Sequence, residues 1–444
     1  MGDEIDEYAK LVRRMNSPKV LIDNDSCAHA TIIQVDTVNS HGTLLAVVQA
    51  LTDLNLVITK AYISSDGVWF MEVFYVTDSD GNKVKDEGIL NYIQKALETD
   101  TYVVNSIKNS INMLPSKEHT LIELSGTDRP GLLSEVSAVL MDLGCNVVDA
   151  EIWTHNARAA AVMHITEQST GSAVEEQNRL SLIEQLLSNV LKGNGNGNFR
   201  RPRICISAPE EKIHTGRRLH QMMFADRDFE RLESETKNRV EPYVIVSDCA
   251  DRDYTVVIVR CRDRPKLLFD AVFALTDMQY AVFHGTVITA GKEAYQEFYI
   301  RHIDGLPVSS EAERQRVAEC LEAAIERRAS EGLELELYTD DRVGLLSDIT
   351  RVLRENGLNI TRAEVTTNQG KAKNSFFVTD VSGSSVDSKT VNFIQQQVGQ
   401  NVLHVRKLNV TIFPEKAPRT RSFLFGSFFK GRSFQNFGLV KSYS

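Results

Sequence analysis

The sequence predicts an α+β fold of four ferredoxin-like βαββαβ units with antiparallel sheets, arranged as two pseudo-equivalent pairs. The first observation is a frame that occurs four times: a turn, a small residue 19 positions later and a β-branched residue 34 positions later. The turn positions are Gly42, Gly131, Lys266 and Gly344, the small residues are Ala61, Ala150, Gly285 and Ala363, and the β-branched residues are Val76, Ile165, Ile300 and Val378. Fixed spacing of this kind indicates one supersecondary unit used four times, here called copies one to four.

The second observation is that the hydrophobic period changes in the same order within every copy. The strand before the turn alternates, as in Ile122 and Leu124 against Glu123, which predicts one solvated face. In copy three residues 256–259 are apolar throughout, so we expect that strand to be covered on both faces. After the turn an apolar stripe at i, i+3, i+6 and i+7 predicts a helix that faces the core.

The remaining elements of each copy are a second strand, a third strand and a second helix. The second strand is expected to be short, as in residues 359–365, and a turn rich in Gly, Asn or Asp follows it. The third strand carries bulky residues, and the second helix is represented by residues 179–191 and 311–328. One further strand would complete a split βαβ unit of about 70–80 residues.

A third observation groups the copies into two halves. Similar leading strands precede copies one and three, over residues 18–23 and 242–248, and similar closing strands end copies two and four, over 204–210 and 408–415. Copies one and two therefore recur as copies three and four. The expected order is an N-terminal segment with its leading strand (1–29), the first unit (30–115), the second (119–209), a charged segment (210–241), the third unit with its leading strand (242–331), the fourth (333–414) and a basic tail rich in phenylalanine (415–444). Within the charged segment we expect a helix over residues 224–236.

Charge and composition argue against several classes of protein. With 60 acidic and 50 basic residues the net charge is −10, and a nucleic-acid partner would need a basic surface. No run approaches 18 consecutive apolar residues, so no membrane span is expected. The six cysteines form no C-x-x-C pair, which indicates a reduced compartment, here expected to be the cytoplasm or the nucleus.

Motifs for catalysis and for cofactor binding are missing from the sequence. There is no G-x-S-x-G, no P-loop and no H-E-x-x-H pattern. His214 and His220 stand six residues apart without a clustered third ligand, so no metal site is expected. We therefore predict that the protein is not an enzyme and uses no cofactor.

The turn between the first strand and the first helix is the main candidate for a binding site. It reads Asp-Arg-Pro-Gly-Leu over residues 128–132 and Asp-Arg-Val-Gly-Leu over residues 341–345. Glycine lets a ligand approach the backbone, free N–H groups at a helix start attract a carboxylate, and the aspartate can cap those groups. Turns that bind nothing use the same residue types, so a purely structural role stays open.

An asparagine accompanies the intact turn in the same two copies. Fifteen residues after the turn position stand Asn146 in copy two and Asn359 in copy four, whereas copies one and three have Val57 and Ala281. The carboxamide could hydrogen-bond both ends of a zwitterion, or it could form a local Asx turn. Because copy three also replaces the glycine by Lys266, we expect two better-equipped sites, one in each half.

These residues resemble the ACT domain family. The runs Asp-Arg-Pro-Gly-Leu-Leu and Gly-Cys-Asn-Val, and the Phe-Tyr-Val-Thr-Asp and Phe-Phe-Val-Thr-Asp segments at 74–78 and 376–380, are similar to the ACT domains that end bacterial uridylyltransferase. A chain of four such copies without a catalytic domain resembles the plant ACT domain repeat (ACR) proteins, and the resemblance covers residues 18–415. It implies that units pair side by side and bind a free amino acid, glutamine-like by that comparison, at the pair interface. The binding positions that it implies are Asp128, Gly131, Leu132, Asn146, Asp341, Gly344, Leu345 and Asn359.

Three hypotheses for function follow. The first is a non-enzymatic sensor that binds amino acids and acts on a partner protein, with homo-oligomers through the ACT sheets as an option. The second is an interaction scaffold whose pairs are structural and which recruits partners through residues 210–241 and the tail. The third is RNA binding, because third-strand aromatics occupy the stacking positions of RNA-recognition motifs, although core packing explains them better: Phe74, Phe298 and Phe376.

Overall fold

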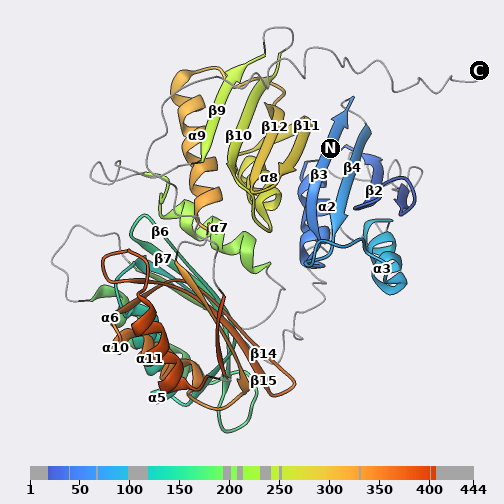
Figure 1. The fold of residues 1–444 in the computed structure, drawn as a ribbon. Coiled ribbons are helices and arrows are strands. Elements are labelled where there is room, and N and C mark those ends of the chain that lie inside the picture. Colours follow the sequence, from blue (N-terminus) through green and yellow to red (C-terminus); the bar gives the residue numbers. More distant parts are fainter. Residues whose placement is uncertain are drawn as a thin grey trace, which may run out of the picture. The chain divides into compact units, whose positions relative to one another are not determined.

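The computed structural model describes residues 19–39, 41–66, 69–98, 119–193, 202–207, 214–230, 242–249, 253–329, 332–400 and 402–406. Their strands form two eight-stranded antiparallel sheets, each made by two copies of the repeat (Figure 1). The predicted α+β class with ferredoxin-like units and antiparallel sheets is confirmed. The units form two pairs, but each pair joins one copy from each half of the chain and not the two copies of one half. None of the helices in these ranges is long and apolar enough to span a membrane.

The first sheet joins copy one to copy three, in the strand order β1-β2-β4-β3-β11-β12-β10-β9. Copy one supplies β1 (Lys19–Asp23), β2 (Thr31–Val38), α2 (Thr43–Asp53), β3 (Val57–Ser65), β4 (Trp69–Thr77) and α3 (Glu87–Glu98). Copy three supplies β9 (Tyr243–Asp248), β10 (Thr255–Arg262), α8 (Leu267–Asp277), β11 (Tyr280–Ala290), β12 (Glu293–His302) and α9 (Glu311–Glu326).

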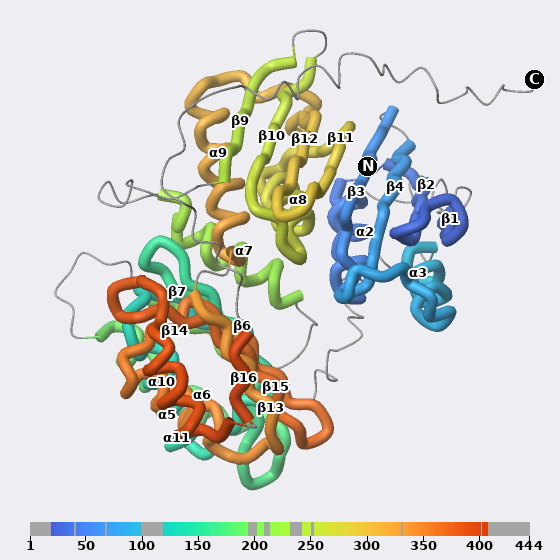
Figure 2. The backbone as a smooth tube through the Cα atoms, in the orientation of Figure 1, coloured from blue at the N-terminus to red at the C-terminus, as the bar shows by residue number. Residues whose placement is uncertain are grey.

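The second sheet joins copy two to copy four, in the order β16-β13-β15-β14-β6-β7-β5-β8. Copy two supplies β5 (Thr120–Thr127), α5 (Leu132–Asp142), β6 (Cys145–His155), β7 (Arg158–Glu167), α6 (Gln177–Lys192) and β8 (Arg203–Ser207). Copy four supplies β13 (Leu333–Asp340), α10 (Leu345–Glu355), β14 (Leu358–Asn368), β15 (Lys371–Asp380), α11 (Ser388–Val398) and β16 (Leu403–Arg406). The four helices of this pair cover one face of the sheet (Figure 2).

Both pairs are joined by the same contact between second strands, β3 with β11 and β6 with β14. Tyr62 lies opposite Thr286 and Glu151 lies opposite Glu364, and all four stand 20 positions after their turns. The equal register gives each pair a local twofold relation. Over each seam the first helices of the two copies also pack together, α2 with α8 and α5 with α10.

The recurring residues of the frame lie in the core. The four β-branched residues are completely buried, at 0% exposure. The small residues stand beside the centre of the seam. At Gly285 an added Cβ would lie 3.0 Å from Cδ1 of Ile63 and 3.2 Å from Cδ1 of Phe298, so no side chain fits there without movement. The spacing in the sequence is therefore the spacing between a helix start, a seam contact and a core residue.

The copies differ in the chain order of their edge strand. In copies two and four the closing strand pairs with the first strand and completes βαββαβ, as β8 with β5 and β16 with β13. In copies one and three the leading strand takes that place, as β1 with β2 and β9 with β10. Copy three has no room for a closing strand, because α9 ends at Glu326 and β13 of copy four begins at Leu333.

Several element boundaries correct the sequence predictions. The last closing strand is Leu403–Arg406, and the predicted segment 408–415 lies outside the described residues, as does the tail. The second strands of copies two, three and four are eleven residues long, because they pair over their whole length with the third strand of the same copy. The first strand of copy three is not covered on both faces, since Val257 is fully buried but Val256 is only half-buried.

The charged segment contains helix α7, Thr215–Ala225, earlier than the predicted helix at 224–236. The helix buries Leu219 and Met223 and ends where Arg227 adopts a positive φ of 54°. Residues 226–230 form turns, and the rest of the predicted range lies outside the described residues. The apolar spacing inside residues 215–225 therefore determines where the helix lies, and the residues from 226 onward do not extend it.

Candidate functional site

All four turns adopt one backbone conformation. The residue ahead of each first helix is left-handed, with φ of 86° at Gly42, 81° at Gly131, 65° at Lys266 and 75° at Gly344. No side chain caps these helix starts, so the predicted capping role of the aspartate is wrong. The first N–H of the helix donates to the carbonyl of the turn arginine in three copies, from Leu132, Leu267 and Leu345 at 3.1, 3.4 and 3.1 Å. The N–H groups that follow it in the first turn have no partner within the helix and suit an anionic acceptor.

The arginine of the turn has a structural role. Arg129 holds both carboxylate oxygens of Glu135 at 2.7 and 2.5 Å. Equivalent pairs join turn arginines to acids four positions after the turn, at 2.7 Å in each case: Arg264 with Asp270 and Arg342 with Asp348. These guanidinium groups are paired within their own copy and fix the helix start, and Arg129 also lines the pocket described below.

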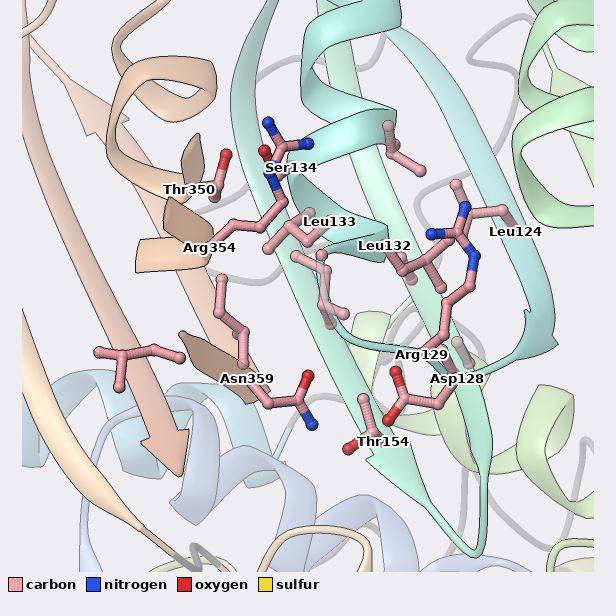
Figure 3. A pocket seen from close by; sticks show the side chains of 18 of the residues that line it. Leu124, Asp128, Arg129, Leu132, Leu133, Ser134, Thr154, Thr350, Arg354 and Asn359 are labelled. Carbon is pink, nitrogen blue, oxygen red and sulfur yellow. The ribbon is translucent and has the colours of Figure 1, made fainter. Parts of the chain in front are cut away.

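The site itself is a pocket between copies two and four (Figure 3). It is an open pocket, and its empty space measures about 540 Å³ when the solvent at its mouth is counted. Copy two contributes the turn residues Asp128, Gly131 and Leu132, together with the start of α5. Copy four contributes the end of α10 and the start of β14, including Asn359.

The two polar side chains predicted for this place converge from different copies. In Figure 3 the carboxyl of Asp128 and the carboxamide of Asn359 point into the same space, with Thr154 between them. Asn146 of copy two does not line this pocket. The expected grouping of each turn with the asparagine of its own copy is therefore wrong, because antiparallel pairing of β6 with β14 brings the start of β14 to the turn of copy two.

The alternative role of the asparagines, a local Asx turn, has no support in the structure. Asn359 and Asn146 lie in regular strand pairing opposite Thr379 and Thr166. Neither carboxamide forms a hydrogen bond with the described part of the chain. The side chain of Asn359 is therefore available to a ligand.

Arg354 is a functional candidate that the sequence did not reveal. Its Cδ lies 2.7 Å from the position of a Cβ added to Gly131, so its side chain crosses the turn of copy two. Figure 3 shows it running toward the start of α5 beside Leu133 and Ser134. It is exposed and forms no ion pair within the described residues. A guanidinium at a helix start is suited to bind a carboxylate.

Asp128 has an unusual proton affinity for a carboxyl group. Burial raises the pKa of Asp128 to about 6, and a hydrogen bond from the backbone N–H of Arg129 only partly offsets this. A bound cation would favour the charged form. The carboxyl group is therefore suited to pair with an ammonium group and to release a proton when it does so.

The remaining predicted residues belong to the half-site related to the pocket by the local twofold axis. It consists of the turn of copy four and the start of β6 in copy two. Gly344 and Leu345 open α10, and the side chain that crosses this turn is Met141, whose Sδ lies 2.9 Å from a Cβ added to Gly344. Met141 and Arg354 stand at the same position of their repeats, ten residues after the turn. The half-site of Asp341 and Asn146 thus has a thioether where the pocket has a guanidinium.

Other candidates from the sequence have structural roles. Phe74, Phe298 and Phe376 are completely buried, so the RNA-stacking prediction for them is wrong and core packing is confirmed. His214 caps α7 by accepting from the N–H of Arg217 at 3.1 Å, and His220 lies 2.8 Å from Asp270. In the described ranges no group of three metal-binding side chains occurs.

Comparisons with known proteins agree with this fold. The model of the ACR family N-terminal ACT domain matches residues 26–104, and the ACT domain model matches residues 120–181 and 334–396. The ACT domain-containing protein ACR4 of Arabidopsis thaliana is 58% identical over 100% of this chain and 99% of its own, and ACR6 is 60% identical over 90% and 92%. A bifunctional uridylyltransferase/uridylyl-removing enzyme of Rhodospirillum rubrum is 28% identical over 51% of this chain and 22% of the enzyme. The chain belongs to the ACR family of ACT domain-containing proteins.

Proposed function

We propose that this protein is a non-enzymatic regulatory sensor that binds a free amino acid in the pocket between copies two and four. The observation that carries the proposal is the meeting of Asp128, Asn359 and Arg354 around the open start of α5. These groups offer a negative charge, a carboxamide and a positive charge to a ligand that carries both charges.

Each end of an amino acid has a suitable partner in this arrangement. The guanidinium of Arg354 and the N–H groups that follow Leu132 in the first turn of α5 would bind the carboxylate. The carboxylate of Asp128 would take the ammonium group, and the carboxamide of Asn359 can donate to one end or accept from the other. The ligand side chain would rest on an apolar floor that includes Leu124 and Ile152.

The position of the pocket explains how binding could regulate a partner protein. The ligand would touch α5 of copy two and both α10 and β14 of copy four, so it would tighten the seam of the second sheet. A ligand that binds only the paired form stabilises it by about 2.7 kcal/mol at a hundredfold excess over Kd. A partner protein that binds only the paired form of copies two and four would then respond to the amino acid.

A thermal-shift screen of the twenty amino acids with the full chain tests the proposal. We expect at least one of them, glutamine-like ligands included, to raise the melting temperature at millimolar concentration. Asn359→Ala and Arg354→Met should each weaken that response about tenfold or more, whereas the matched change Asn146→Ala should leave it intact. Silence with all twenty would refute sensing and favour the scaffold hypothesis.

A further inference from the structure

One row of side chains forms the floor of the pocket across three neighbouring strands. In copy two the row is Leu124, Ala161 and Ile152, paired directly across β5, β7 and β6, and all three line the pocket. The middle residue stands 30 positions after the turn. Because the copies share one frame, the same row can be located in each of them.

The equivalent rows carry a polar side chain between two aliphatic ones. The middle residue is Glu72 in copy one, Gln296 in copy three and Asn374 in copy four. Its cross-strand neighbours are Val35 and Ile63, Val259 and Val287, and Leu337 and Val365, respectively. Copy two alone has alanine at this position, and copy two is where the pocket opens.

These three polar side chains are buried without the partners that such groups normally have. Glu72, Gln296 and Asn374 are 0%, 1% and 2% exposed. Both carboxyl oxygens of Glu72 and the carboxamide oxygens of Gln296 and Asn374 have no hydrogen-bond partner in the described residues. Leaving a buried polar group unpaired costs about 1–3 kcal/mol, so packing alone does not account for three such residues at one position.

The residue two positions further along the third strand adds to the contrast. Copy two has Met163, which lines the pocket, where the other copies have the buried rings of Phe74, Phe298 and Phe376. An alanine followed by a flexible methionine leaves room above the floor in copy two. A polar chain followed by a rigid ring fills the same room elsewhere.

We propose that the middle position of the floor row decides which copy accepts a ligand. In copies one, three and four the polar side chain occupies the space that, in copy two, an α-amino acid enters above Ala161. The chain therefore holds one amino acid, in copy two, and the half-site of copy four is closed by Asn374. This inference rests on the proposed function. It assigns the number of amino acids bound by each chain, and the copy that binds them, to the residue in the middle of the floor row.

Native mass spectrometry of the full chain in an equimolar mixture of the twenty standard L-amino acids tests the inference by counting bound molecules. We expect one per wild-type chain and none for Ala161→Asn. To open the half-site of copy four, Asn374→Ala is combined with Met141→Arg, which supplies the guanidinium that crosses the turn in the other orientation. The double variant should bind two, and Met141→Arg alone should bind one.

The outcomes separate this inference from the proposed function. Two or more molecules on the wild-type chain, or one on the double variant, overturn the assignment of Asn374 as a closing residue while leaving sensing intact. No molecule on the wild-type chain overturns the proposed function and the inference with it. Asn374→Ala removes a carboxamide whose oxygen has no partner, so the variant should fold, and a melting transition as cooperative as that of wild type checks this before ligand is counted.

Discussion

Asp128 couples the protonation of the site to ligand binding and to stability. Its pKa of about 6 lies above the value of about 3.9 for an exposed aspartate. The folded state therefore binds more protons than the unfolded state between about pH 4 and pH 6, and its stability falls as the pH rises through that window. Above it the charged carboxyl group remains a cost that only a cationic ligand group would offset.

Replacement of Asp128 by Asn should therefore stabilise the free protein at neutral pH. We expect Asp128→Asn to raise the free energy of unfolding by about 1–2 kcal/mol at pH 7 and by nothing at pH 4, after allowance for partial solvent screening. Urea unfolding at both pH values measures this. Asp341→Asn, which removes the equivalent charge in copy four, is the control, and an Asp128→Asn variant less stable than wild type at pH 7 would contradict the prediction.

The same carboxyl group gives ligand affinity a pH dependence. Only its charged form attracts an ammonium group, and at pH 5 about one molecule in ten carries that form when the pKa is about 6. We expect the affinity for the amino acid identified by screening to fall about tenfold from pH 7 to pH 5. Isothermal titration at both pH values checks this, and the Asp128→Asn variant should lose the difference.

Gly131 shows how a contact between copies constrains one residue. Gly131 and Gly42 share a left-handed backbone, but an added Cβ meets Arg354 only at Gly131 and nothing within 4 Å at Gly42. Gly42→Ala should cost about 1 kcal/mol from backbone strain alone, and Gly131→Ala should cost more and also weaken ligand binding. Urea unfolding and calorimetry compare the two; equal costs with unchanged binding would argue against a role for Arg354.

Among the elements, α7 and the turn after it join copies that are not paired in a sheet. Arg218 of α7 holds both oxygens of Glu123 in copy two at 2.6 Å. In the turn, Asp228 receives hydrogen bonds from Arg327 at 2.6 and 2.5 Å and lies 3.0 Å from Nδ1 of His155. The charged segment between the halves thus connects copies two and three, through a partly exposed ion pair at Arg218 and a buried cluster around Asp228.

The charges in this cluster depend on one another. Burial opposes the charge on Asp228, but Arg327 and His155 outweigh it and hold the pKa of Asp228 below its usual value. Burial likewise lowers the pKa of His155, but hydrogen bonds to Asp228 and Glu326 outweigh it and raise that pKa overall. The His155 contribution is present below about pH 6.5 and is lost as the pH rises through the higher pKa of the folded state.

Removal of the central acid should leave Arg327 without its carboxylate partner and His155 with Glu326 alone. We expect Asp228→Asn to lower the free energy of unfolding by about 3 kcal/mol, the usual effect of breaking a buried pair. The exposed pair of Asp248 and Arg314 is the control, and Asp248→Asn should cost less than about 1 kcal/mol. Urea unfolding of both variants decides, and similar costs would show that α7 and its turn do not join the copies energetically.

At the scale of the whole molecule, each sheet is completed by the other half of the chain. Copy one pairs with copy three and copy two with copy four, so the edges of β3 and β6 are covered only when both halves are present. A homo-oligomer is not needed to cover these two edges. An uncovered strand edge is a template for pairing with another chain.

A half chain of residues 1–209 should therefore not stay monomeric. Both seams have a local twofold register, so two half chains can replace the missing copies by pairing β3 with β3 and β6 with β6. We expect light scattering after size exclusion to show a dimer or larger species for the half chain. A well-folded monomer would contradict the energetic importance of the seams.

The sequence by itself determined the unit, because its information is local. The periods of two and 3.6, the turn glycines and the spacing to Ile165 depend on neighbours within one copy, and the structure confirms them. The tertiary structure decided which copies pair. It thereby decided which residues are neighbours in the site. Asn359 and Asp128 line one pocket, and Arg354 crosses Gly131. No periodicity records these choices, since they depend on the fit of whole surfaces from distant parts of the chain.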